Sequence, residues 1–295
     1  MTAPTFKDLG SLAQNLIFNG FPGQFGFNIL ALASGLSFTS SASQLANKNI
    51  CTSLLTSKIF KQQGFTVEGS VSSDGIIPTY TGQLVLQDKL FPGLKTILSG
   101  NIITSSDNLK KTCSGKVSTL YYYGNQASVE AVFSYLDKPT LCLNLVASEK
   151  DTSIGVSSVI STLSETQKLK EYSVKLQQIP AKNFVMNFFW NSQEQVSTGS
   201  SLYYNNKDAK LETAASVSLF PFKPGTPPTF YVAIAKTLDN NASLKARFCS
   251  ENKTISLALK HRICDELSAT LGWQGSLSDD IFTNQKFGLA LNFII

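Results

Sequence analysis

Charged residues are scarce in this chain. Asp, Glu, Lys and Arg make up 15% of its 295 residues, against roughly 25% in soluble domains. A hydrophobic content of 42% that includes 20 Phe excludes intrinsic disorder. Because a soluble protein covers its surface with charged side chains, we expect part of this surface to avoid water.

The sequence also lacks a hydrophobic run of about 20 residues, the length of a membrane-spanning helix. The uncharged stretch over residues 9–47 comes closest, but Gly20, Pro22 and other residues interrupt it. Residues 1–10 lack the basic start and apolar core of a secretory signal. If the chain enters a membrane, a closed β-barrel is the structure that can satisfy its backbone hydrogen bonds.

Residues that carry enzyme chemistry are few. His261 is the one histidine, which argues against Ser-His-Asp, Cys-His and multi-histidine metal sites. No glycine-rich phosphate-binding motif and no paired-cysteine zinc motif occurs. The net charge of +5 is spread without a Lys/Arg cluster, which argues against nucleic acid as a partner. We therefore expect no catalytic residue, no metal and no cofactor.

The N-terminal residues have a helical period. The apolar positions are Phe6, Leu9, Leu12, Ala13, Leu16 and Ile17. Pro4 or Thr5 can begin this helix and Gly20 with Pro22 can end it, so the pattern predicts about four turns followed by a Gly-rich hinge. We expect residues 1–25 to form the helix and hinge and residues 26–295 to form one β-barrel.

From residue 26 onward the hydrophobic period is two. Apolar residues alternate with Ser, Thr, Asn, Lys and Gly in segments of about ten residues, bounded by turn-forming clusters, as in residues 255–262 and 287–293. The polar face is small and weakly charged, which suits a water-filled lumen, so the pattern predicts an all-β transmembrane barrel. About 270 residues at about 14 per strand and turn give roughly 19 strands.

Three segments resemble the mitochondrial porins, the voltage-dependent anion channels. They are residues 4–10, residues 87–95 with the Gly-Leu-Lys motif, and residues 286–293. The third is similar to the β-signal that directs the insertion of mitochondrial outer-membrane barrels, whose defining positions are here Lys286, Gly288, Leu291 and Phe293.

The resemblance implies a 19-stranded barrel with the N-terminal helix inside the pore. It implies a voltage-dependent, anion-selective channel of the mitochondrial outer membrane that passes nucleotides such as ATP and ADP, metabolite anions and small ions by diffusion. In the Gly93-Leu94-Lys95 motif it implies that Lys95 contacts nucleotide, and a lumen lysine is a sensible phosphate contact.

The helix departs from the porin pattern in its charge. Ser11, Gln14 and Asn19 stand where porins usually carry Lys or Arg, so the cations of the lumen must come from the wall. By strand phase we assign anion contacts to Lys95, Lys116, Lys175, Lys245, Arg247, Lys260 and Arg262, and we place Lys286 on the lumen side. We also expect that removal of residues 2–19 changes the width of the pore more than its ion preference.

The same alternation assigns the last strand its two faces. Leu289, Leu291 and Phe293 are expected to face lipid, whereas Lys286, Ala290 and Asn292 are expected to face the lumen.

Two other functions stay open. A protein-import pore of the same barrel superfamily would carry a longer polar N-terminal extension and acidic lumen patches, whereas this chain starts almost directly with its helix. A porin-like scaffold subunit would have lost much of its transport role. The expected partners are the lipid bilayer and, for the channel, ATP, ADP and small anions; a homo-oligomer or a membrane complex is compatible with the sequence.

Overall fold

The structure is a computed structural model. It describes residues 3–22, 26–33, 36–44, 50–60, 65–73, 78–88, 91–104, 111–135, 139–161, 168–192, 196–223, 225–277 and 285–294. Residues 23–25 of the predicted hinge, and Lys89 and Leu90 of the porin-like stretch, lie outside these ranges.

Beyond the N-terminal helix, the described secondary structure is β. The strands are β1 (Gly26–Ala33), β2 (Leu36–Gln44), β3 (Ile50–Phe60), β4 (Phe65–Ser73), β5 (Pro78–Gln87), β6 (Leu94–Thr104), β7 (Lys111–Tyr123), β8 (Ala127–Tyr135), β9 (Thr140–Glu149), β10 (Thr152–Ser161), β11 (Lys168–Ala181), β12 (Phe184–Asn191), β13 (Ser197–Asn206), β14 (Leu211–Leu219), β15 (Thr229–Thr237), β16 (Ala242–Cys249), β17 (Thr254–Arg262), β18 (Leu267–Ser276) and β19 (Lys286–Ile294). Apolar and polar side chains alternate along these segments. Because alternate residues of a strand point to opposite faces of a sheet, each segment can place its apolar residues on one face and its polar residues on the other.

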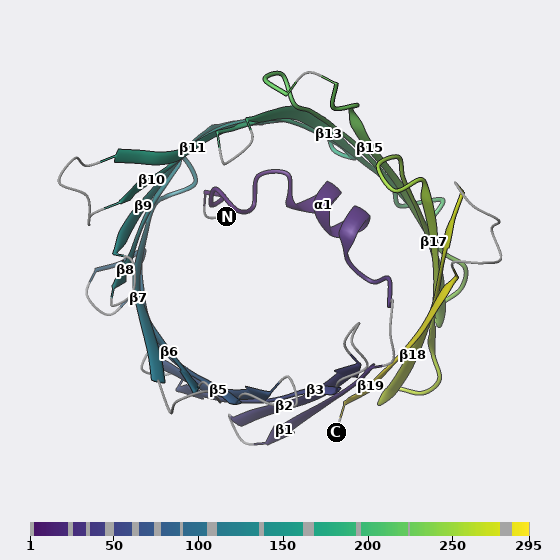
Figure 1. The fold of residues 1–295 in the computed structure, drawn as a ribbon, viewed down its shortest axis with the longest axis horizontal. Coiled ribbons are helices and arrows are strands. Elements are labelled where there is room, and N and C mark those ends of the chain that lie inside the picture. The colour runs from purple at the N-terminus through teal and green to yellow at the C-terminus, as the bar shows by residue number, and fades with distance from the viewer. Residues whose placement is uncertain are drawn as a thin grey trace.

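The strands form one sheet in which each pairs antiparallel with the next along the chain. The first and last strands, β1 and β19, pair in parallel with Asn28 opposite Asn292, and Asn28 Nδ2 donates to Asn292 Oδ1 over 2.9 Å. This pairing joins the two edges, so the 19-stranded sheet closes into the ring of Figure 1. A parallel seam follows from the odd strand number, because directions alternate around the ring.

The helix α1 (Ser11–Phe18) is shorter than the pattern predicts. Residues 6–10 form turns, in which the Asp8 carboxylate accepts hydrogen bonds from Thr5 N–H at 2.7 Å and Thr5 Oγ1 at 2.8 Å. Gly10 follows with φ +82°, a left-handed conformation that a helix interior does not admit. The prediction of about four turns from Pro4 or Thr5 was therefore wrong at its start. Among the described residues, no helix has the length and hydrophobicity needed to cross a membrane.

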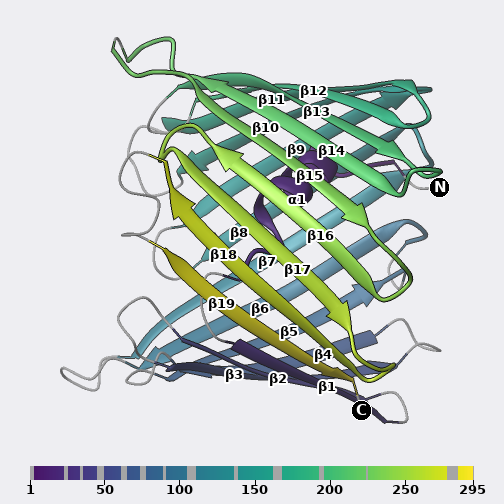
Figure 2. The same ribbon diagram turned by 90° about the vertical axis from the view of Figure 1, so that its right-hand side faces the viewer.

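Both ends of the described chain lie at the same end of the ring. Ala3 N–H donates to the Gly124 carbonyl in the β7–β8 turn, and Ile294 N–H donates to the Glu266 carbonyl in the β17–β18 turn. These turns follow odd-numbered strands and so lie at one end, as the termini do in Figure 2. The strands run obliquely in the same view, as closure of a barrel requires.

Figure 1 places α1 inside the ring, beside β13 and β15. The prediction of an all-β barrel of about 19 strands with the N-terminal helix inside it is confirmed.

Candidate permeation pathway

Alternate residues of each strand point into the ring. A Cβ atom placed on Gly155 of β10 would lie 2.7 Å from Leu9 Cδ1, which belongs to the N-terminal segment, residues 3–22, inside the ring. Ala290 and Asn292 of β19 line a cavity together with Phe21 of the N-terminal segment. Since the period of a strand is two, the register then fixes the inward face of every neighbouring strand.

The opposite positions carry apolar side chains on the outside of the ring. Leu145, Val232 and Leu271 expose 53%, 51% and 56% of their surface. Many other outward strand residues are large, apolar and exposed as well, and a continuous apolar surface of this kind marks a region that a membrane or a partner covers. An outward apolar band around a polar lumen is the surface that a bilayer surrounds.

Helix α1 covers one side of the lumen wall. Ala13 and Ile17 are fully buried, and they pack with Leu16 against small or aromatic inward residues of the wall, including Ala214 and Ala233. Phe18 adds an edge-to-face contact with Tyr231, with ring centroids 5.1 Å apart. The apolar face of the helix therefore determines where the N-terminal segment lies in the pore.

A lysine of the wall holds the residues that precede the helix. Lys175 Nζ, on β11, donates to the carbonyls of Phe6 at 3.3 Å and Leu9 at 3.4 Å, and it lies 4.5 Å from the centroid of the Phe6 ring. The wall also supplies Gln177, whose Oε1 accepts the Gly10 N–H at 3.1 Å. Gly10 has no side chain to cap the helix, and the barrel wall accepts the N–H group of Gly10 itself.

Two cations of β16 hold the other end of the helix. Lys245 Nζ donates to the carbonyls of Asn15 and Asn19, and Arg247 Nη1 donates to the Ile17 carbonyl at 3.4 Å. Both cations also lie over the Phe21 ring, at 4.8 and 4.7 Å from its centroid. The last turn of α1 contains no basic residue of its own, so wall cations meet the negative end of the helix dipole.

Beside this contact lies a cationic hollow between the segment and β16–β19. It has a volume of about 480 Å³ and is lined by Phe21, Lys245, Lys260, Thr270 and Asn292, among others. Ammonium groups with nearby hydroxyl and amide donors are suited to bind anions. Lys245 and Lys260 line this hollow from the barrel wall.

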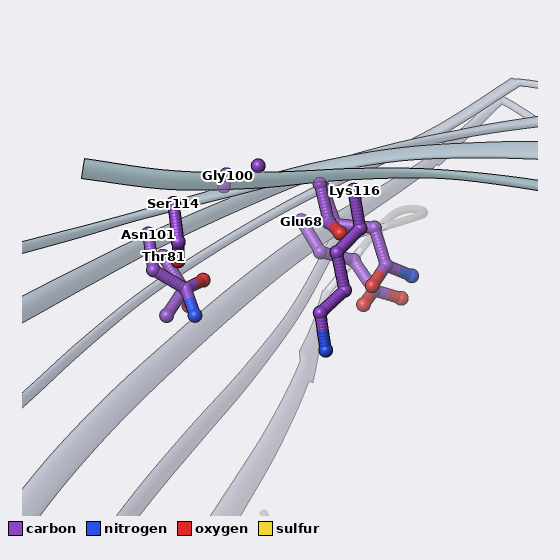
Figure 3. Close-up of a pocket in the computed structure, with 10 residues that line it drawn as sticks. Glu68, Thr81, Gly100, Asn101, Ser114 and Lys116 are labelled. Carbon is purple, nitrogen blue, oxygen red and sulfur yellow. The ribbon is translucent and has the colours of Figure 1, made fainter. Parts of the chain in front are cut away.

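Across the lumen lies a wall that α1 does not cover, which we call the bare wall. It is the inward face of β4–β7, with Glu68, Gln83, Ser99, Asn101, Ser114 and Lys116 around a hollow of about 280 Å³. Figure 3 shows Asn101, Ser114 and Lys116 on one side of the sheet. The register places Glu68 and Lys116 three strands apart, roughly 14 Å, and no ion pair joins them among the described residues. Lys116 is exposed to the lumen.

The Gly-Leu-Lys motif begins β6. Gly93 has φ +80°, its N–H donates to Asp88 Oδ1 at 2.8 Å, and its carbonyl accepts the Tyr122 N–H at 3.0 Å. A Cβ atom there would lie 2.8 Å from the Tyr122 carbonyl oxygen, so only glycine fits. Leu94 points outward, and Lys95 takes the inward phase opposite Leu120. The motif therefore builds a turn and points one lysine into the lumen.

The other predicted residues have varied surroundings. Arg262, at the end of β17, forms an ion pair with Asp265 at 2.9 Å. Lys286 and Gly288 take the inward phase of β19, with Gly288 opposite Gly272, while Leu291 and Phe293 take the outward phase. Ala290 and Asn292 lie on the lumen side, as the alternation predicts.

A model of the eukaryotic porin family matches residues 2–288. The chain belongs to the eukaryotic porin family.

The chain is also 26% identical over 277 residues to a voltage-dependent anion-selective channel of Drosophila melanogaster, with 92% of each protein covered. Among solved structures, the P pilus usher translocation pore matches 87% of the chain with 9% identity and a TM-score of 0.35. The chain spans 59% of that pore, and a score this low is no sign of a common topology.

In this porin, sequence reasoning missed the hydrogen bonds by which side chains of the barrel wall hold the N-terminal segment. The acceptors are backbone carbonyls, which no residue type identifies, so only the donors Lys175, Lys245 and Arg247 were visible. A signal did exist, because a helix without C-terminal cations inside a cation-lined barrel leaves its carbonyls to the wall. Among the described residues, no three His, Cys, Asp or Glu side chains gather as metal ligands.

Proposed function

We propose that this porin is a voltage-dependent, anion-selective channel of the mitochondrial outer membrane. It passes nucleotides, metabolite anions and small ions by diffusion and has no enzymatic activity. Membership of the eukaryotic porin family supports a channel in an outer membrane, and the Drosophila relative is named as a voltage-dependent anion-selective channel. The organelle, the voltage dependence and the nucleotides belong to the proposal.

The observation that carries the proposal is the charge of the inward face. Among the strand residues with described side chains, eight cations take inward positions: Lys95, Lys116, Lys175, Lys245, Arg247, Lys260, Arg262 and Lys286. Among the strand residues with described side chains, the inward carboxylates are Glu68, Glu130, Glu171 and Glu212. This excess of cations lowers the energy of an anion in the pore.

Within the proposal, nucleotides and other anions are contacted by the Gly93-Leu94-Lys95 motif and the wall cations. Lys95, Lys116 and Lys260 are the principal contacts, since Lys175, Lys245 and Arg247 already donate to the N-terminal segment and Arg262 is paired with Asp265. Lys286, Gly288, Leu291 and Phe293 form the insertion signal.

The test is the reversal potential of the purified chain in a planar bilayer under a KCl gradient. We expect a modest anion preference that grows at low salt, because the Debye length rises from about 3 Å at 1 M to about 30 Å at 0.01 M. Reversal of two bare-wall charges, Lys95→Glu with Lys116→Glu, should move the pore towards cation preference at low salt.

Lys236→Glu is the matched control. Lys236 lies on β15 at an outward register position, opposite Leu211 and Leu244, so its reversal should leave ion preference unchanged. A cation-preferring pore that peptides block would instead indicate a protein-import pore, and the absence of conductance would indicate a scaffold subunit.

A further inference from the structure

The N-terminal segment and the wall enclose a cavity of about 210 Å³. Gly10, Gln14, Ile17 and Phe18 line it from the segment side. The wall side follows one register row across β12–β15, with Asn187 opposite Ser201, Ser201 opposite Ser216, and Ser216 opposite Tyr231. The wall side of the cavity therefore combines this polar row with Phe188 and Phe189, and the segment side is largely apolar.

One buried polar atom of this wall has no partner. Asn187 exposes 4% of its surface, and its Oδ1 receives no hydrogen bond, while its Nδ2 reaches Ser201 Oγ at 3.4 Å. The Ser201 hydroxyl can donate as well as accept, so the amide can turn over and keep this bond. In either orientation one end of the amide stays unsatisfied, which is unfavourable in a buried site. A bound group can remove this cost.

The charge at the cavity is positive. Lys175 lines it, and no carboxylate of the described residues forms an ion pair with this lysine. Its two hydrogen bonds go to neutral carbonyls at 3.3 and 3.4 Å, so a half-buried ammonium group lacks a counter-charge. Asn187 is the diagonal neighbour of Lys175 across the β11–β12 pair, a separation of roughly 7–8 Å between Cα atoms.

We propose that this cavity binds a small organic carboxylate with an apolar body. The carboxylate lies between Lys175 and Asn187, and the amide turns its Nδ2 towards it while Ser201 donates to Oδ1. The apolar body packs under Ile17 and Phe18. An occupant so placed bridges the segment and the wall and therefore stabilises the docked position of α1.

The volume sets the size of the occupant. An engineered apolar cavity of roughly 150 Å³ holds benzene, so 210 Å³ accommodates a molecule such as benzoate. Benzoate is the probe, and benzamide, which has nearly the same shape and no charge, is its control. A nucleotide is too large for this cavity, which separates the site from the transport of nucleotides.

The experiment is isothermal titration of the full-length chain in detergent micelles with benzoate and with benzamide. We expect saturable benzoate binding, at least tenfold weaker benzamide binding, and a loss of at least tenfold in benzoate affinity for Lys175→Met. Ser216→Leu fills the cavity without removing a lumen cation, and it should cause a similar loss. The titration needs no conductance, so its result is independent of channel activity.

The matched control is Lys116→Met, which removes the same charge from the bare wall and should change benzoate affinity less than twofold. If Lys116→Met weakens binding as much as Lys175→Met does, the lumen potential attracts benzoate and the cavity does not. Binding that survives Ser216→Leu unchanged, equal affinity for benzamide, or no saturable binding of benzoate would each overturn the proposal.

Discussion

The two sides of the lumen use the same kind of residue for different purposes. On the side that α1 covers, Lys175, Lys245 and Arg247 donate to backbone carbonyls of the N-terminal segment. On the bare wall, Lys116 points into an open hollow. All four have the same phase in their strands, so the difference comes from what lies opposite each cation.

This comparison shows that a lumen cation contributes to permeation only as far as its charge is uncompensated. Carbonyl oxygens carry partial negative charge, and those at the end of a helix add to its dipole. A lysine that donates to such carbonyls therefore attracts a passing anion less strongly than a lysine that is exposed to water. The covered side therefore positions the segment, and the bare wall sets most of the ion preference.

The largest expected effect comes from reversing the two cations at the end of α1, Lys245→Glu with Arg247→Glu. Hydrogen bonds to charged groups contribute roughly 1.5–3 kcal/mol each, and the new carboxylates would face carbonyls. We expect the segment to leave the wall at least ~100-fold more often. The measurement is the rate at which an impermeant maleimide labels Ala13→Cys in a cysteine-free background, because Ala13 is fully buried in the docked state.

The corresponding reversal on the bare wall, Lys95→Glu with Lys116→Glu, is the control for that rate. It changes the net charge equally but removes no contact with α1, so labelling should stay within about twofold of the parent. Equal acceleration by both double variants would show that net charge, and not the carbonyl contacts, holds the segment.

A smaller effect is expected from the apolar face of the helix. Ile17 is fully buried, whereas Leu12 of the same helix is 48% exposed. Large-to-small substitutions at buried sites cost about 2–5 kcal/mol, and the low end applies here because the helix packs on one side only. Ile17→Ala should accelerate the labelling of Ala13→Cys about 30-fold, since 1.4 kcal/mol corresponds to tenfold. Leu12→Ala should change the rate little, and a comparable acceleration by it would contradict the docked orientation of α1.

Removal of residues 2–19 should produce a moderate change that differs from what the sequence predicts. The uncharged helix suggests a wider pore with little change in ion preference. In the structure the deletion also frees Lys175, Lys245 and Arg247, so we expect the low-salt reversal potential to shift towards stronger anion preference as conductance rises. The same deletion in a Lys245→Gln/Arg247→Gln background should widen the pore with a smaller shift.

The smallest effect concerns a turn on the covered side, outside the lumen. The Asp239 carboxylate accepts the N–H groups of Asn241 at 2.7 Å and Ala242 at 2.6 Å, and these bonds lower the pKa of Asp239. A carboxyl group whose pKa is lower in the folded than in the unfolded chain stabilises the folded state at pH values above its unfolded pKa, which is about 3.9. This stabilisation disappears as the pH falls through the folded pKa.

We therefore expect the amide of Ala242 to lose hydrogen-exchange protection, relative to its intrinsic rate, below about pH 4. Asp239→Asn should remove this pH dependence. The β16–β17 turn is the internal control, because Lys253 N–H there donates to the Ser250 carbonyl and to no carboxylate. Loss of protection in both turns would point to global unfolding by acid.

Much of the fold was predictable because its signal is local. The ladder from Ile255 to Leu259 alternates apolar and polar residues, and strand β17 contains it with Leu257 and Leu259 outward and Ala258 buried on the other face. The helix was found by its period, but its start was placed wrongly, because the break at Gly10 depends on one backbone conformation that apolar spacing does not record.

The sequence by itself determined the barrel, the approximate strand number and the inward phase of the eight wall cations, because a strand assigns its faces through neighbouring residues alone. Only the tertiary structure decided which lysines stay open to the lumen. That choice depends on contacts between residues far apart in the chain, such as Lys245 with the carbonyls of Asn15 and Asn19. Because every residue type has the same carbonyl group, no pattern of side chains marks these acceptors, and only the course of the segment through the closed ring brings them to the lysine.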